Sequence, residues 1–134
     1  MLIFEIHSVP RPQQQTRFRK VAFGIRAYDP SKLTKQQIQW QISPQAPKEP
    51  LRGAVAMDMT FYMPIPAGTN KIQRALMLNG TLRPIKRPDF DNLAYVVTNA
   101  LKGIVYRDDS QVVDCGIHKY FSESPRTVVK VWEI

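Results

Sequence analysis

The stretch KRPDFDNLAYVVTNALKGIVYRDDSQVVD, from Lys86 to Asp114, contains the clearest helix signal in the chain. Its apolar residues recur at intervals of three and four positions, which places them on one face of an α-helix. These residues are Leu93, Val96, Val97, Ala100, Leu101 and Ile104. Asp91 stands where a helix N-cap belongs, and Gly103 stands where a C-terminal stop belongs. The stretch therefore predicts an amphipathic helix over residues 91–103 that packs against a core.

Strand signals lie on both sides of this helix. In the segment 53–64, apolar residues alternate with polar ones, which indicates a strand with one face in the core. Three further segments are predicted as strands, at 2–7, 111–121 and 127–134, and two as helices, at 29–42 and 68–80. Strands mixed with helices in this way are typical of an α+β fold. We expect a single domain over residues 1–134, with two to three helices packed against a mixed β-sheet.

Composition limits the class of protein. At 134 residues the chain suits one domain. No apolar run approaches the roughly 18 residues that a membrane span needs. The N-terminal segment lacks the basic region of a secretory signal. The single cysteine, Cys115, excludes an internal disulfide and a cysteine-rich zinc site, and is expected to be a small core residue. These features predict a cytoplasmic protein with no membrane partner.

The charge of the chain favours a polyanionic partner. The formal net charge is +8, which on its own could equally serve solubility. Its distribution is more informative, because residues 11–35 hold a run of basic residues against one acid, Asp29. The basic residues are Arg11, Arg17, Arg19, Lys20, Arg26, Lys32 and Lys35. A basic arm of this kind, read as an extended loop or hairpin, is expected to contact phosphates.

The acidic residues are concentrated in the stretch from Lys86 to Asp114. Of the 11 acidic residues in the chain, five lie there: Asp89, Asp91, Asp108, Asp109 and Asp114. Each could be a local device, such as a helix cap or a turn residue. Alternatively, if the chain after the helix returns toward the helix start, Asp108 and Asp109 would meet Asp89 and Asp91.

Such a meeting of carboxylates would have chemical consequences. Like charges about 4 Å apart repel by about 4 kcal/mol at an effective dielectric constant near 20, so the group would take up protons or bind a cation. Oxygen ligands without histidine or cysteine select Mg²⁺ or Mn²⁺. An acidic metal site on a basic surface is suited to phosphodiester hydrolysis.

Two motifs in this stretch resemble the signature of the RusA-type Holliday junction resolvases, which are found in prophages and bacteria. The first is a D-x-D-N-L helix start over residues 89–93, and the second is a D-D-x-Q-V turn over residues 108–112. The resemblance is specific over residues 86–121 and diffuse elsewhere. It implies a metal-dependent endodeoxyribonuclease that nicks paired strands of four-way DNA junctions in recombination and repair.

The resemblance also implies roles for particular residues. The catalytic aspartates are expected at Asp89, Asp91 and Asp109, and Asp108 is added to them as a ligand of Mg²⁺ or Mn²⁺. The active species is expected to be a homodimer bound to branched DNA, with no small-molecule cofactor, since two symmetric cuts need two sites. Contacts with the DNA backbone are expected from Arg17, Arg19, Lys86, Arg87 and Lys119.

One residue departs from the family pattern. Many members carry a lysine four residues after the second aspartate of the first motif, where this chain has Tyr95. Tyr95 should stand one helical turn from Asp91, and it supplies no positive charge at neutral pH. Partial packing or contact with substrate would explain it. Two alternatives therefore stay open: a branched-DNA-binding module with weakened catalysis, and a nuclease that acts on flaps or forks.

Overall fold

A ten-residue strand, β4 (Val55–Pro64), forms the centre of the fold in the computed structural model, which describes residues 1–134. The odd-numbered residues of β4 from Val55 to Met63 are buried, because their side chains all point to the same face of the strand. Asp58, Thr60 and Tyr62 point to the other face and are partly exposed. The alternation predicted from the sequence is thus confirmed.

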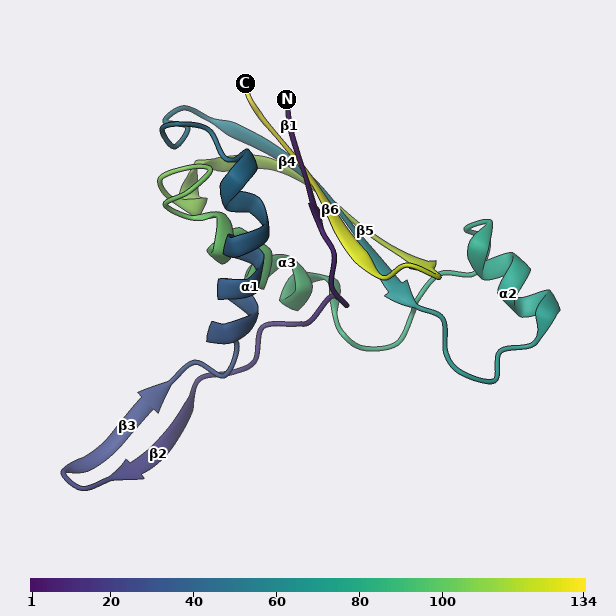
Figure 1. Cartoon of the computed structure of the whole chain (residues 1–134), viewed down its shortest axis with the longest axis horizontal. Helices are drawn as coiled ribbons and strands as arrows, with labels where there is room; N and C mark the ends of the chain where they lie inside the picture. The colour runs from purple at the N-terminus through teal and green to yellow at the C-terminus, as the bar shows by residue number, and fades with distance from the viewer.

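The four strands of the main sheet are arranged in the order β1-β6-β4-β5 (Figure 1). The flanking strands are β1 (Leu2–Ile6), β6 (Arg126–Glu133) and β5 (Val112–Ser122). β4 runs parallel to β5 and antiparallel to β6, and β6 runs antiparallel to β1. A parallel pair needs a long crossover, and here the crossover contains the predicted amphipathic helix. The expected α+β fold with a mixed sheet is confirmed.

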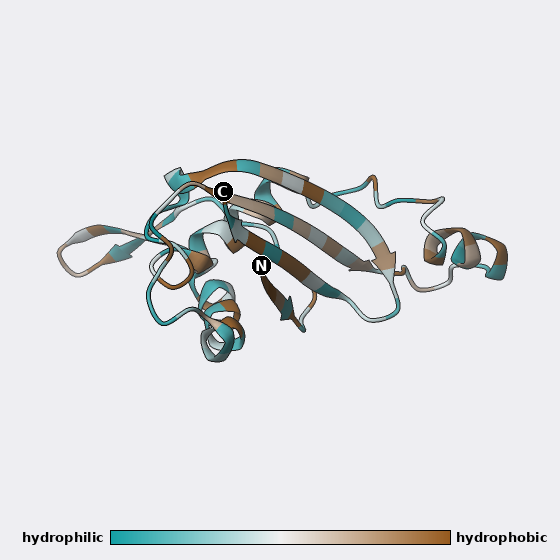
Figure 2. Ribbon diagram, turned by 90° about the horizontal axis from the view of Figure 1, so that it is seen from above, coloured by the Kyte–Doolittle hydropathy of each residue, from teal (hydrophilic) through white to brown (hydrophobic).

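The amphipathic helix α3 (Phe90–Leu101) packs its apolar face against the sheet and against α1 (Lys32–Ile42). Six residues of α3 are buried: Leu93, Ala94, Val96, Val97, Ala100 and Leu101. α1 buries only Ile38 and Ile42, and it leaves Trp40 87% exposed. The core therefore lies between the sheet and these two helices, and apolar and polar positions are interspersed along the strands (Figure 2).

Two elements project from this body at opposite ends (Figure 1). One is a separate hairpin of β2 (Arg17–Val21) and β3 (Gly24–Tyr28), and the other is the short helix α2 (Lys71–Leu78). Neither buries a single residue. Two single-turn helices, η1 (Ser43–Gln45) and η2 (Asp109–Gln111), complete the elements. No helix is long and apolar enough to cross a membrane.

Two local expectations were wrong. Asp91 lies in the first turn of α3, and Asp89 occupies the N-cap position instead. Cys115 is exposed, because β5 is an edge strand of the sheet and no element covers this side chain. On the partly exposed face of β4, Asp58 forms a hydrogen bond of 2.8 Å with the His118 imidazole of the neighbouring strand β5.

The segment that follows α3 is fixed by the buried residue Tyr106. Its hydroxyl group donates a hydrogen bond of 2.6 Å to the backbone carbonyl of Thr98. That carbonyl is one of the last four of the helix, which lack a helical donor. Burial raises the pKa of Tyr106 far above its usual range, so the phenol stays neutral and keeps donating.

We expect Tyr106→Phe to lower the free energy of unfolding by about 1–2 kcal/mol, because a buried carbonyl loses its donor. Urea denaturation followed by circular dichroism would measure this loss. Tyr28→Phe, at an exposed position of the hairpin, should leave the transition unchanged. Equal midpoints for Tyr106→Phe and the unmodified protein would contradict the role given to this hydroxyl group.

Candidate functional site

Asp89 and Asp91 stand at the start of α3, and both are exposed. Asp89 has an extended backbone and makes no capping hydrogen bond with its side chain. Asp91 lies in the first turn, where the positive end of the helix dipole stabilises a carboxylate. The sequence folds this way because the apolar residues from Leu93 onward face the core, which leaves the helix start at the surface. The two carboxylates are therefore available to a ligand.

Asp108 lies at the opposite end of α3. The ammonium group of Lys102, the residue after the last helical position, is 2.9 Å from the Asp108 carboxylate. Asp108 and Asp109 therefore lie toward the end of α3 that is remote from Asp89. Accordingly, no group of three His, Cys, Asp or Glu side chains in the chain is close enough to hold a metal ion.

Within one protomer, the chain after α3 does not return to the helix start, so it does not bring the four aspartates together. After α3 the segment turns back only as far as Thr98, where Tyr106 is bonded. The chain then leaves through η2 into β5, whose first residue, Val112, pairs with the first residue of β4, Val55. Asp89 and Asp91 thus form one group, and Asp108 and Asp109 form a second.

Asp108 is engaged by partners within the chain. Its side chain accepts hydrogen bonds from the hydroxyl and backbone N–H groups of Ser110, while its own backbone N–H donates to the Gln111 side chain. The bonds from Ser110, together with the ammonium group of Lys102, hold the pKa of Asp108 well below its usual range. The Gln111 amide also donates to the carbonyls of Leu51 and Gly53. Asp108 thus acts as the anchor of the turn that presents Asp109.

The three aspartates predicted to be catalytic have no ion-pair partner in the chain. The ion pairs that involve aspartate engage only Asp29, Asp58 and Asp108. This is notable because the chain has 19 lysine and arginine residues available for pairing. The negative charges of Asp89, Asp91 and Asp109 are therefore not neutralised by basic side chains of the same chain.

One exposed stripe of α3 connects the two acidic groups. Asp91, Tyr95, Thr98 and Lys102 follow one another at spacings of three and four residues, so they lie along one side of the helix. Tyr95 is 52% exposed on this stripe, and partial packing accounts for the remainder of its surface. The stripe therefore has Asp91 at one end and the Lys102–Asp108 ion pair at the other.

Lys119 of β5 is bound to the connector between α2 and α3, residues 79–88, which leads into Asp89. Its ammonium group donates hydrogen bonds of 3.0 Å to the carbonyl of Lys86 and 2.8 Å to the carbonyl of Pro88. The connector is also held by Arg83, whose side chain donates to the backbone carbonyl of Lys119 at 2.6 Å. No local sequence pattern predicts these contacts, because they join segments more than 30 residues apart.

A polar hollow lies beside Asp89. The residues that line it are Pro12, Gln13, Arg87, Pro88, Asp89 and Asn92. The backbone N–H of Gln13 donates to the carbonyl of Asn92 at 2.9 Å, which ties the N-terminal segment to the start of α3. The side-chain oxygen of Gln13 is buried and has no hydrogen-bonding partner. The hollow thus brings the Asp89 carboxylate and the Arg87 side chain together beside the start of α3.

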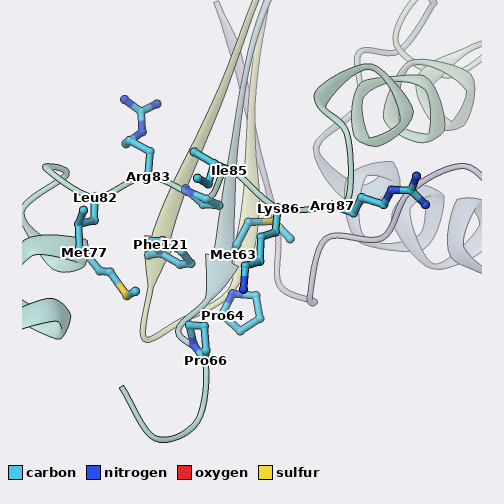
Figure 3. Close-up of a pocket in the computed structure, with 11 residues that line it drawn as sticks. Met63, Pro64, Pro66, Met77, Leu82, Arg83, Ile85, Lys86, Arg87 and Phe121 are labelled. Atoms are coloured by element: carbon cyan, nitrogen blue, oxygen red, sulfur yellow. The ribbon is translucent and has the colours of Figure 1, made fainter. Parts of the chain in front are cut away.

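A second hollow, between α2 and the end of the sheet, lacks residues for hydrolytic chemistry (Figure 3). Met63, Met77 and Phe121 line it, and no acidic residue, histidine or cysteine contributes to it. Lys86 and Arg87 stand between the two hollows. Figure 3 shows the Lys86 side chain extending toward Pro64 and the Arg87 side chain extending away from this hollow.

The remaining predicted DNA contacts lie on the projecting hairpin. Arg17 and Arg19 are both on β2, and both are exposed. The hairpin joins the N-terminal end of α1, as Figure 1 shows. The five predicted DNA contacts thus lie in three places, namely the hairpin, the connector before Asp89 and strand β5.

Comparison with known proteins places this chain in a family. Residues 8–132 match the family described as endodeoxyribonuclease RusA. An uncharacterized protein of Bacillus subtilis (strain 168), YqaN, is 34% identical over 135 residues, which cover 98% of this chain and 95% of that protein. The chain belongs to the RusA endodeoxyribonuclease family.

Proposed function

We propose that this protein is a Mg²⁺- or Mn²⁺-dependent endodeoxyribonuclease that resolves four-way DNA junctions by paired, symmetric nicks. Family membership supports DNA as the substrate and hydrolysis as the reaction. The observation that carries the proposal is the set of three unpaired aspartates, Asp89, Asp91 and Asp109, on a chain of net charge +8. The basic surface would attract the DNA backbone, and the free carboxylates would form the hydrolytic site.

The active unit in this proposal is a two-fold dimer. In a two-fold dimer every contact occurs twice. If one residue of the first chain contacts a different residue of the second chain, the same pair also meets with the two chains exchanged. If the exposed stripes of two α3 helices face each other in antiparallel orientation, Asp89 and Asp91 approach the partner's Asp109. The same operation places Asp109 beside the aspartates at the start of the partner's helix. Each site is then completed by the second chain, which would explain why neither is complete within one.

The donor set of such a composite site fits a hard divalent cation. Asp89 and Asp91 from one chain and Asp109 from the other provide only carboxylate oxygens, which Mg²⁺ and Mn²⁺ prefer. A cation bound there would activate water and stabilise the negative charge that develops on the phosphate. Asp108 would hold the turn that positions Asp109, since Lys102 and Ser110 already occupy its carboxylate.

The basic residues would bind and orient the DNA. Arg87 lines the hollow that contains Asp89, so it would hold a phosphate next to the site. Lys86, Arg17 and Arg19 would contact phosphates farther along the DNA without reading bases. The two composite sites would lie about 18 Å apart, the length of α3, and each would cut one strand.

Tyr95 favours one alternative function, a DNA-binding module with weakened catalysis. It is half exposed beside Asp91 where many relatives carry a cation. A cleavage assay with Mg²⁺ on synthetic four-way junctions, flaps and forks distinguishes all three functions. A binding module leaves every strand intact, whereas a flap or fork nuclease cuts those substrates faster than the junction.

We expect Asp91→Asn to abolish cleavage of a four-way junction while the dissociation constant changes less than about threefold, because the amide removes a charge needed for hydrolysis and not for phosphate contact. Gel-based cleavage and fluorescence anisotropy measure the two quantities. Asp114→Asn, an exposed aspartate on the edge strand, serves as the matched control. Unchanged turnover in Asp91→Asn would remove this residue from the site.

Subunit mixing tests whether two chains complete one site. Asp91→Asn and Asp109→Asn chains should each be inactive alone. After exchange, each mixed dimer retains one site with all its aspartates intact. Under random pairing about a quarter of all sites are then intact, so the nicking rate should return to about a quarter of that of the unmodified protein. Nicks in single strands, without paired cuts, are the expected product. A mixture that stays inactive despite proven exchange would show that each site belongs to one chain.

Lys119→Met should reduce the cleavage rate at saturating DNA about tenfold, because the connector that positions Asp89 loses two hydrogen bonds. If Lys119 serves only to position Asp89, the salt dependence of junction binding should stay the same. A phosphate contact would instead lower the slope of log affinity against log salt by about one. Lys119→Arg, which keeps donors, should recover part of the rate. Hydrogen exchange of residues 83–89 provides the structural readout.

A further inference from the structure

The β2–β3 hairpin contains residues whose arrangement the fold does not explain. All ten strand residues are exposed, and they form a sheet of only two strands. An isolated two-stranded hairpin is marginally stable at best in water. Its side chains therefore serve something other than packing within this chain.

The root of the hairpin is firmly attached beside the candidate site. Asp29, directly after β3, accepts hydrogen bonds from the Gln13 side chain at 3.0 Å and from the Ser31 backbone at 2.9 Å, and it pairs with Lys35 at 2.7 Å. Gln13 in turn is bonded to Asn92, next to Asp91. The hairpin thus extends about 17 Å, for five residues per strand, from a root fixed to the start of α3.

One face of the hairpin is basic. Residues that pair directly across the strands point to the same face, so Arg17 and Arg19 share a face with Tyr28 and Arg26. Arg19 is directly opposite Arg26, and such a pair of like charges destabilises a hairpin. The hairpin holds no acidic residue, and the nearest one, Asp29, is already paired. An external polyanion is therefore the natural counter-charge.

The apex of the hairpin presents an aromatic ring to solvent. Val21 pairs with Gly24, so the turn consists of Ala22 and Phe23. Phe23 is 101% exposed, which means that its ring contacts no part of the chain. Aromatic rings flanked by basic residues bind nucleic acid by stacking on bases that are not paired.

We propose that the β2–β3 hairpin is a DNA-binding arm in which Arg17, Arg19 and Arg26 follow the phosphates of one duplex arm and Phe23 stacks on an unpaired base at a branch point. The choice of branched DNA rests on the proposed function. A two-stranded ribbon has the width that a DNA groove accepts. A second copy of this chain is a poor occupant of the basic face, because its net charge is also +8. Phe23 is thereby added to the residues predicted from the sequence.

The test measures binding without cleavage, in buffer with EDTA. Fluorescence anisotropy gives the affinity of each variant for a four-way junction and for a linear duplex of equal length. Phe23→Ala should weaken junction binding about tenfold and leave duplex binding unchanged, because stacking on one base is lost. Phe18→Ala removes the same side chain from the other face of the same hairpin, and should leave the preference for the junction unchanged.

The basic face is tested by the double variant Arg19→Gln/Arg26→Gln. Affinity for both DNAs should fall, and the slope of log affinity against log salt should decrease by about two, one for each lost phosphate contact. Lys48→Gln/Lys130→Gln removes two exposed charges from other parts of the chain and should not change the slope. Thermal unfolding of each variant confirms that the fold is intact.

A 2-aminopurine base placed at the branch point reports stacking directly. Its fluorescence should be quenched by the unmodified protein and much less by Phe23→Ala. Equal losses on junction and duplex for Phe23→Ala, or no loss on either, would overturn the role of the apex. An unchanged salt slope in the arginine variant would overturn the role of the basic face.

These measurements are independent of the proposed function. If the unmodified protein leaves every branched DNA uncut in Mg²⁺, the nuclease proposal fails while the binding data still decide the role of the hairpin. Heparin, a polyanion without bases, serves as the competitor. If heparin displaces every variant from the junction as readily as from the duplex, the hairpin recognises polyanions in general, and the assignment to branched DNA is overturned.

Discussion

Burial of one face of α3 is the constraint on which the rest of the structure depends. Six of its residues are buried, and they form the layer between α1 and the sheet. Because that face is committed to the core, the opposite stripe must face outward and the helix ends must emerge at the surface. Asp89 and Asp91 lie at the start of this helix, and Asp108 and Asp109 follow its end. Their division into two separate groups is therefore a consequence of core packing.

Neutralisation of charge separates the aspartates by role. Asp29, Asp58 and Asp108 each have a basic partner within 3 Å, and each fastens a local segment. Asp89, Asp91 and Asp109 have no such partner, although basic residues are plentiful. Leaving exposed carboxylates unpaired costs little in water, and it keeps them available for a ligand. Asp114 is unpaired as well, so it is the sequence motif that singles out Asp89, Asp91 and Asp109 among the unpaired aspartates.

The sequence predicted the fold well, because its strongest signals are periodic. The alternation from Val55 to Met63 and the helical spacing from Leu93 onward both proved to mark the core. The site was predicted less completely. The motif identified the aspartates, but the distance between their two groups depends on how far the chain returns after α3, which Tyr106 limits through Thr98. Likewise, the bonds of Lys119 to the connector join distant segments, and no local pattern encodes them.

The connector that leads into Asp89 has an effect beyond the site. β5 is an edge strand of 11 residues, and an open edge of that length can pair with the same edge of another molecule. Arg83 occupies the Lys119 carbonyl and stacks 3.6 Å over the Tyr120 ring, so the connector covers part of this edge. The contacts that hold an aspartate in position thereby also protect the protein from strand-to-strand aggregation.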